Sequence, residues 1–367
     1  MVSMHTLDAI VFPYLVVVLL WVVIAFFVVS IAALFVGLGI HKRHLAKRES
    51  NYRRQIEAYA HAISQFREGD ETCLPSVADF DAACALGAAL TKTFRTQDIP
   101  PQAALLEAIR NSGAALLVMA YLDAKDWGQR FRAVTALGDL RLPELFDKLV
   151  EIAHSEPHMS VFGNCLYAAA NSVSRPDQIR TLFDLINSRR DISAGYDEGM
   201  FRLAIQALRR HDAQLEALAA VLRPCLQSEE ADEQHLLALV LAMGKEQLVA
   251  FKNDMVNIVR SRGSARLTAA VMRAVHSMHL CDSIISEYVG SSDPMLNIAA
   301  IRSAECCGPD IVPLIGRELR STDFNVRYAA AVTLSKLGEN GHNELIERRQ
   351  DSDPFARDMA AFALSVG

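Results

Sequence analysis

The feature that most constrains this chain is an uninterrupted apolar segment close to its N-terminus. Residues 13–40 contain no Asp, Glu, Lys or Arg. A helix needs about 20 predominantly apolar residues to cross about 30 Å of hydrocarbon, at about 1.5 Å per residue. We therefore predict a transmembrane helix at residues 13–40, in preference to a buried core helix of a soluble protein.

The charges on either side of this segment predict its orientation. Residues 1–12 contain no Lys or Arg, whereas Lys42, Arg43, Lys47 and Arg48 follow the segment directly. A cleaved signal peptide would carry its positive charges before the apolar core. Because positive charge stays on the cytoplasmic side, we expect a single-pass protein of the bacterial inner membrane with residues 1–12 outside. The four cations are expected at the membrane surface, where they attract anionic lipid.

Within the apolar segment, Ala33 and Gly37 have the small-xxx-small spacing that lets two membrane helices approach closely. They are candidates for packing against a second membrane helix. The alternative is an anchor that faces only lipid.

Two helical regions are expected between the anchor and the rest of the chain. Residues 41–72 have apolar residues at helical spacing and are predicted to form a basic juxtamembrane stalk helix. Residues 73–122 are predicted to form a helical cap, because Pro and Gly divide them into short helical stretches.

Charge and cysteine usage exclude some classes of protein. The net charge is −6, which argues against a nucleic-acid-binding surface. The seven cysteines are scattered and most lie in apolar helical patterns. We therefore expect free, buried thiols in a reducing compartment. The vicinal pair Cys306 and Cys307 is expected to be part of the core.

A repeated pattern covers residues 123–367. Residues 323–334 read DFNVRYAAAVTL, and a similar row begins thirty residues later at Asp353 and thirty residues earlier at Asp293. Further copies begin at Ser264, Asp232, Asp197, Glu156 and Asp126, and a shorter apolar helical stretch lies between copies. Each repeat is therefore predicted to be a pair of helices, with an Asp that caps the helix start and a stripe of Ala that permits close packing. Because one pair cannot bury its apolar face alone, the pairs are expected to stack.

These rows resemble the short, roughly 30-residue HEAT repeats of bacterial proteins. The resemblance implies an all-α fold, a HEAT-like right-handed α-solenoid of helix pairs preceded by one transmembrane helix. The arginine of the motif is present as Arg130, Arg327 and Arg357, so an inter-repeat Asp–Arg ladder is expected to be continuous only at the C-terminal end.

The sequence offers no set of catalytic or cofactor-binding residues. It has no phosphate-binding glycine loop, nucleophile elbow or zinc-protease signature. His276 and His279 lack further ligands that would complete a metal site. We expect no catalytic residue, no cofactor and no metal. The alternative from a different class is a tetrapyrrole-handling, lyase-like enzyme, because some proteins with similar repeats act on tetrapyrroles.

Two stretches are candidates for partner binding. The 41-residue interval before Asp197 places an insertion that includes Arg189, Arg190 and Tyr196. An acidic turn suited to a basic partner contains Glu229, Glu230, Asp232 and Glu233. Both stretches also fit ordinary solvated loops.

Together these features predict a non-catalytic, membrane-tethered scaffold that binds another protein, expected to be an integral membrane protein, along a cytoplasmic solenoid. The architecture is similar to that of membrane-tethered HEAT proteins that accompany membrane glycosyltransferases of exopolysaccharide synthesis and secretion. An adaptor of a signalling or secretion assembly is the alternative within the same class.

Overall fold

The computed structural model describes residues 4–67, 74–95, 103–188, 194–210 and 215–366. The side chains of residues 4–20, 22–25, 28, 67, 95, 103, 194–196, 210, 215 and 366 lie outside this description. Within the described ranges every regular element is a helix, so the fold is all-α, as predicted.

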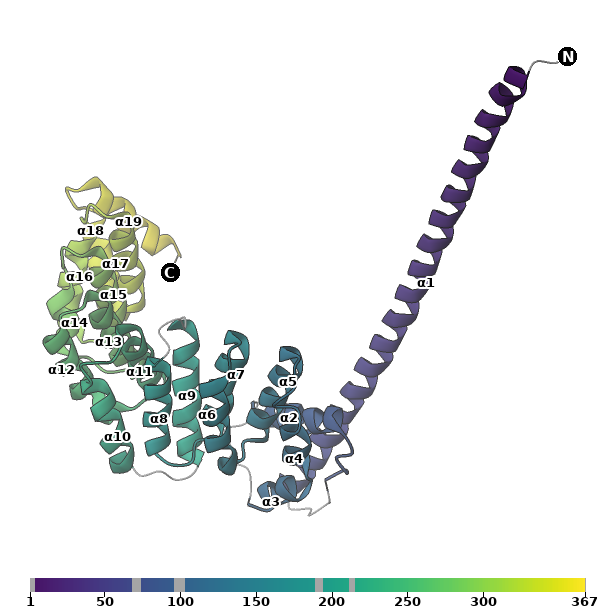
Figure 1. Cartoon of the computed structure of the whole chain (residues 1–367). Coiled ribbons are helices and arrows are strands. Elements are labelled where there is room, and N and C mark those ends of the chain that lie inside the picture. The colour runs from purple at the N-terminus through teal and green to yellow at the C-terminus, as the bar shows by residue number, and fades with distance from the viewer. Residues whose placement is uncertain (1–3, 68–73, 96–102, 189–193, 211–214, 367) are drawn as a thin grey trace.

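The first helix, α1, runs without a break from Met4 to Arg67 and has 64 residues. Its N-terminal part projects away from the other helices, and its C-terminal part packs against α2, Phe80–Arg95 (Figure 1). Tyr59, Ile63 and Phe66 are buried in this packed part. Residues 41–67 of the expected stalk thus belong to the same helix as the apolar segment before them, and residues 68–72 lie outside the described residues.

The remaining helices are mostly short and follow one another in pairs. They are α3 (Ala103–Asn111), α4 (Ala114–Met119), α5 (Trp127–Leu140), η1 (Pro143–Leu145), α6 (Phe146–Ser155), α7 (Met159–Asn171), α8 (Asp177–Asn187), α9 (Ala194–Arg210), α10 (Leu215–Gln227), α11 (Glu233–Lys245), η2 (Val249–Phe251), α12 (Lys252–Arg262), α13 (Ala265–Ser277), α14 (Ser283–Tyr288), α15 (Pro294–Ser303), η3 (Ala304–Cys306), η4 (Pro309–Ile311), α16 (Val312–Glu318), α17 (Phe324–Lys336), α18 (Gly338–Arg348) and α19 (Pro354–Val366).

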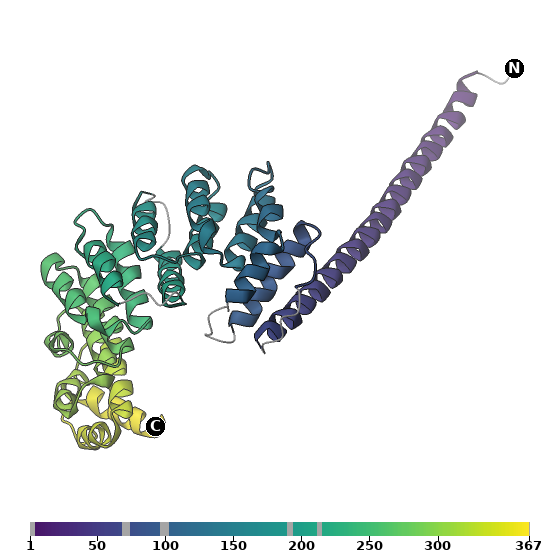
Figure 2. The same cartoon turned by 90° about the horizontal axis from the view of Figure 1, so that it is seen from below.

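The pairs form two layers along a curve. From α5 onward, the odd-numbered helices α5 to α19 contact one another in sequence and line the inside of the curve, and we call them the inner row. The even-numbered helices α6 to α18 cover the outside and form the outer row (Figures 1 and 2). This arrangement of many helix pairs is consistent with a helical repeat solenoid.

Local chemistry at the helix starts explains this regularity. Asp126, Asp232, Asp293 and Asp323 are N-caps whose carboxylates accept a backbone N–H two residues on, at 3.0, 2.8, 2.9 and 2.7 Å. Such caps satisfy backbone donors that a helix start would otherwise leave unpaired. Each cap therefore starts its helix at the same point in its repeat.

Small residues set the close spacing within the inner row. A Cβ atom added to Gly138 would lie 2.6 Å from the Cα of Ala168 on the next inner helix. One added to Gly244 would lie 2.5 Å from the Cα of Ala274. The small-residue stripe of the repeat thus lies where neighbouring inner helices approach most closely.

The cysteines differ in part from expectation. Cys84, Cys165 and Cys225 are free and buried, and burial raises the pKa of their thiols to about 11, 12 and 11. In contrast, Cys281 and Cys307 are joined in a disulfide, with their Cα atoms 4.9 Å apart. The prediction of free thiols was wrong for this pair, because the fold brings together residues that are 26 positions apart in sequence.

The predicted transmembrane segment, residues 13–40, falls partly on side chains outside the described set. Among the described residues, no helix combines the length and the apolar character that spanning a membrane requires.

Candidate functional site

The inner row exposes side chains that the outer row and neighbouring inner helices leave uncovered, and this inner face is the candidate site. At its C-terminal end, aromatic residues gather on α17 and α19. Phe324, Tyr328, Phe355 and Phe362 are 57, 40, 54 and 40% exposed. The ring of Tyr328 lies 6.2 Å from that of Phe324 and 6.0 Å from that of Phe362, measured between centroids. Met295 of α15, 45% exposed, adds to this set, which we call the aromatic patch.

A smaller apolar cluster lies at the start of α5 and α7. Trp127 is 48% exposed and stacks on His158, with ring centroids 4.3 Å apart. Phe131 and Met159 are also exposed. Large exposed apolar groups of this kind are typical of protein interaction surfaces.

The centre of the inner face is polar. On α9, Arg202 and Gln206 both bond to a carboxylate oxygen of Glu246, at 3.2 and 2.8 Å, and Arg209 donates to its backbone oxygen. Lys245 of α11 pairs with Glu198 at 2.5 Å. The cations of this part of the face are therefore held by carboxylates of the same molecule.

The motif arginines do not form the expected ladder between repeats. Arg327 donates to the backbone oxygens of Ser321 and Thr322, at 2.7 and 3.0 Å. Arg357 makes the equivalent contacts with residues 351 and 352. Both guanidinium groups thus close the loop before their own helix. Arg130 does the same and also pairs with Glu156 of the next repeat at 2.8 Å.

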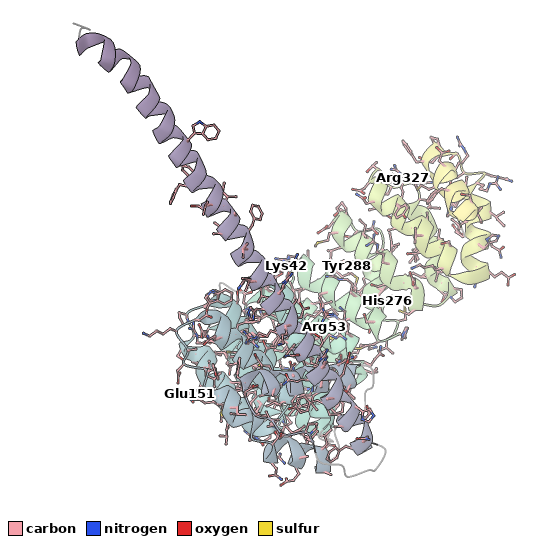
Figure 3. All side chains as sticks on the ribbon, turned by 90° about the vertical axis from the view of Figure 1, so that its right-hand side faces the viewer. Lys42, Arg53, Glu151, His276, Tyr288 and Arg327 are labelled. Carbon is pink, nitrogen blue, oxygen red and sulfur yellow. A yellow bond between two sulfur atoms is a disulfide. The ribbon has the colours of Figure 1, made fainter. Side chains whose placement is uncertain are left out.

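Packing with aromatic rings further fixes Arg327. Its guanidinium carbon lies 4.5 Å from the ring centroid of Phe355 and 5.7 Å from that of Phe324. A cation over an aromatic face is attracted by the ring quadrupole. Arg327, labelled in Figure 3, therefore supports the aromatic patch from beneath.

The acidic turn predicted as a contact site lies at the start of α11. Glu229 and Glu230 are exposed, whereas Asp232 caps α11 and Glu233 accepts a hydrogen bond from the hydroxyl of Ser264 at 2.6 Å. Only the first two carboxylates are thus free of a structural role in the repeat.

Glu229 also borders a groove of about 580 Å³ between α10 and α12. The groove contains the ion pair of Arg223 and Asp254, at 3.1 Å. Arg262 closes one side by donating to backbone oxygens of residues 228 and 231. Both charges of the ion pair are therefore already matched.

The insertion predicted as a recognition loop falls largely outside the described residues. Arg189 and Arg190 lie outside the described residues, and so does the side chain of Tyr196.

The basic run of α1 lies where this helix leaves the packed helices, as the position of Lys42 in Figure 3 shows. Lys42, Arg43 and Lys47 are exposed. Arg48 instead pairs with Asp81 of α2 at 2.6 Å, and Arg132 of α5 pairs with the same carboxylate at 2.6 Å. These two arginines hold the pKa of Asp81 below its usual value. Arg48 thus joins α1 to the row, in addition to any role at a membrane surface.

The preceding part of α1 is apolar and uncovered. Every described side chain from residue 29 to 40 is exposed, and Trp21, Phe26 and Phe35 are 66, 68 and 69% exposed. Ala33 and Gly37 lie in this stretch, and nothing lies within 4 Å of a Cβ added to Gly37.

A buried polar cluster between α8, α9 and α11 was not predicted. His235 contacts Asn187 through Nδ1 at 2.7 Å and Asp197 through Nε2 at 3.4 Å. The carboxylate of Asp197 is fully buried and neither oxygen has a hydrogen-bond partner among the described residues. Burial raises the pKa of Asp197 to about 6 and lowers the pKa of His235. Within the described chain, no group of three or more His, Cys, Asp or Glu side chains is arranged to hold a metal ion.

Comparisons with known proteins add little. No family model matches the sequence. No curated protein matches it either. Among solved structures, an engineered protein from the Northeast Structural Genomics Consortium aligns with 87% of this chain and 95% of its own, at 17% identity and a TM-score of 0.32. A TM-score this low does not indicate a shared fold.

Proposed function

We propose that the chain is a membrane-tethered scaffold that binds a protein partner through the inner face of a HEAT-like right-handed α-solenoid. One observation carries the proposal. A helix whose described apolar side chains between residues 21 and 40 are exposed, with a basic run directly after them, continues without interruption into a row of stacked helix pairs. The apolar half of α1 needs an apolar environment, and the row of helix pairs offers an extended surface to a partner.

The apolar half of α1 supports the tether. Soluble proteins rarely expose apolar surface over more than a few hundred Å². The 28 uncharged residues at 13–40 give the helix enough length to span a bilayer with some tilt. Exposed Lys42, Arg43 and Lys47 suit anionic headgroups and favour the helix row on the cytoplasmic side of a bacterial inner membrane.

The repeats support the solenoid. Equivalent Asp caps, close Gly–Ala contacts between inner helices and the alternation of inner and outer helices are features of stacked repeats. Such arrays bind partners along an extended inner surface. A tether confines that surface to the membrane and raises the effective concentration of an integral membrane partner.

We further propose that this partner is a membrane glycosyltransferase of exopolysaccharide synthesis and secretion. The support is the similarity in architecture, a membrane tether followed by HEAT-like repeats. Purification of the full-length protein in mild detergent, followed by mass spectrometry, is expected to recover such an enzyme. A complex without any integral membrane enzyme would contradict this choice of partner.

The tether has its own test. Phe27 and Leu34 are 60 and 64% exposed on α1. Each Arg placed in a membrane helix costs about 2.5–3.5 kcal/mol of insertion free energy. Phe27→Arg combined with Leu34→Arg is therefore expected to move the protein from the carbonate-resistant membrane pellet to the supernatant.

Leu116→Arg provides the matched control, because Leu116 is 70% exposed on α4, outside the apolar segment. This variant is expected to stay in the pellet with the wild type. Release of the wild-type protein by carbonate would refute the tether.

A further inference from the structure

The inner helices α13 and α15, which precede α17 in the inner row, carry two arginines that no carboxylate of the described chain neutralises. Arg273 of α13 and Arg302 of α15 are exposed, and no described acidic side chain forms an ion pair with either one. The Nε of Arg273 donates to the backbone oxygen of Ala269 in its own helix at 3.3 Å, which leaves its terminal N–H groups available. We propose that the aromatic patch and these arginines form one docking surface for an acidic amphipathic segment of a partner protein. The inference specifies the chemistry of the partner and rests on the proposed scaffold function.

The register of the repeats makes the surface continuous. Arg273 is the ninth residue after the N-cap Ser264, and Arg302 is the ninth after the N-cap Asp293. The ninth residues after Asp323 and Asp353 are Val332 and Phe362. Because α13, α15, α17 and α19 contact one another in sequence, two cations and then two apolar side chains cross the inner face in a line.

A second line runs parallel to the first, nearer the helix starts. The fifth residues after the same caps are Ala269, Ile298, Tyr328 and Asp358. Ile298 is partly buried against the core and Tyr328 is exposed. The contact of Tyr328 with Phe362, 6.0 Å between ring centroids, links the two lines. The surface is thus apolar toward α17 and α19 and cationic toward α13 and α15.

Other charges around this surface are already engaged or lie at its edge. Lys336 pairs with Glu305 at 2.6 Å, and the carboxylate of Asp323 accepts backbone N–H groups of its own helix. Asp358 is exposed on α19, at the far side from the arginines.

This pattern selects for one kind of partner. Aromatic residues that pack into an apolar patch supply most of the binding free energy of a small interface, and guanidinium groups make strong, bidentate bonds to carboxylates. A helix with bulky apolar residues along one face and Glu or Asp along its flank matches both features. A basic segment would place like charges beside Arg273 and Arg302 and would be disfavoured.

The test uses two fluorescein-labelled peptides and the full-length protein in a neutral detergent. With inner helices about 8–10 Å apart, a helical peptide of about 18 residues, about 27 Å long, crosses four of them. Both peptides carry Leu and Phe on one face, and their flanking residues are Glu in one peptide and Lys in the other. Fluorescence anisotropy is expected to show at least about tenfold tighter binding of the Glu peptide.

Charge reversal supplies the decisive comparison. The double variant Arg273→Glu and Arg302→Glu is expected to prefer the Lys peptide, a change that simple loss of folding cannot produce. Tyr328→Ser is expected to weaken both peptides about tenfold or more. Arg317→Glu is the matched control, because Arg317 is exposed on the outer-row helix α16, and it should leave the preference unchanged.

The outcomes separate this inference from the proposed function. Equal binding of both peptides, or a preference that Arg317→Glu also reverses, would overturn the acidic-partner inference and leave the tether intact. Release of the protein from membranes by carbonate would refute the tether, and the peptide preference would still be measured on the same protein.

Discussion

Two buried aspartates lie at contacts between neighbouring repeats, and their environments are opposite. At the central joint of α8, α9 and α11, both carboxylate oxygens of Asp197 lack a described hydrogen-bond partner, and the pKa is raised to about 6. At the C-terminal joint of α16, α18 and α19, Asp351 accepts from the backbone N–H of Asp353 and pairs with Arg320 and Arg348. Those bonds hold the pKa of Asp351 well below its usual value.

The difference shows how departures from the repeat motif affect stability. The C-terminal repeats follow the motif closely, and the buried carboxylate of Asp351 has partners in the backbone and in two arginines. The central repeats depart from the motif, and there folding buries a carboxyl group without adequate bonds. A buried carboxylate without partners destabilises the folded state, whereas a buried carboxylate with several partners stabilises it.

The largest effect is expected from removing the matched charge. Asp351→Ala leaves Arg348 half-buried without one of its two carboxylate partners and removes the acceptor of the Asp353 N–H. Breaking a buried ion pair in this way costs about 3–5 kcal/mol. We expect a loss of about 4 kcal/mol in the free energy of unfolding, measured by urea titration. Asp358→Ala, at an exposed site of α19, serves as control and should change stability little.

A disulfide lies between these two aspartates in the helix row. The Cys281–Cys307 disulfide connects the turn before α14 with the end of η3 and closes a loop of 26 residues. For such a loop, chain entropy predicts a stabilisation of about 3.5 kcal/mol. Addition of dithiothreitol is expected to lower the melting temperature of the wild type and to leave Cys281→Ser unchanged. Identical melting of the wild type with and without reductant would contradict the link.

The two aspartates predict opposite dependences of stability on pH. Because the folded-state pKa of Asp197 is raised, the folded protein binds this proton more tightly than the unfolded chain does. Its contribution to stability is present below about pH 4 and is lost as the pH rises to about 6, by up to about 3 kcal/mol. Asp351 has the opposite sign, because its stabilisation is present above about pH 4 and is lost at lower pH.

Urea titrations of the wild type and Asp197→Asn between pH 4 and pH 8 measure this contribution. His235 lies 3.4 Å from Asp197, so the difference between the two proteins measures Asp197 together with its interaction with His235. The variant is expected to gain stability relative to the wild type as the pH rises. A difference that does not change with pH would show that Asp197 titrates normally.

Much of the helix pattern was predictable from local chemistry. Asp126, Asp232, Asp293 and Asp323 were expected at helix starts, and each one is an N-cap. Capping and apolar periodicity act within about one turn of helix, so the sequence carries them directly. Asp197 and Glu156 are exceptions. α9 begins three residues before Asp197, at Ala194, so Asp197 lies inside that helix. Glu156 is the C-cap of α6, and the N-cap of α7 is His158.

The candidate site was far less predictable. Phe324, Tyr328 and Phe362 fit an apolar helical stripe as well as any core residue does, and they are exposed because no described helix covers them on the inner face. The contact of Asp197 with His235 and the Cys281–Cys307 disulfide join residues from different repeats, which no spacing in the sequence indicates. The motif arginines were predicted to bond between repeats, yet Arg327 and Arg357 bond to the carbonyls of their own loops.

The continuity of α1 has a mechanical consequence. No loop interrupts this helix between its apolar half and the part that packs on α2, and Arg48 and Arg132 both hold Asp81 at the junction. Because α1 is one uninterrupted helix, its apolar half and the helix row at its C-terminal end are expected to move together. Any change in the inclination of the apolar half must therefore swing the whole row through the same angle, and the displacement grows with distance from α1, so that α19 at the far end travels furthest.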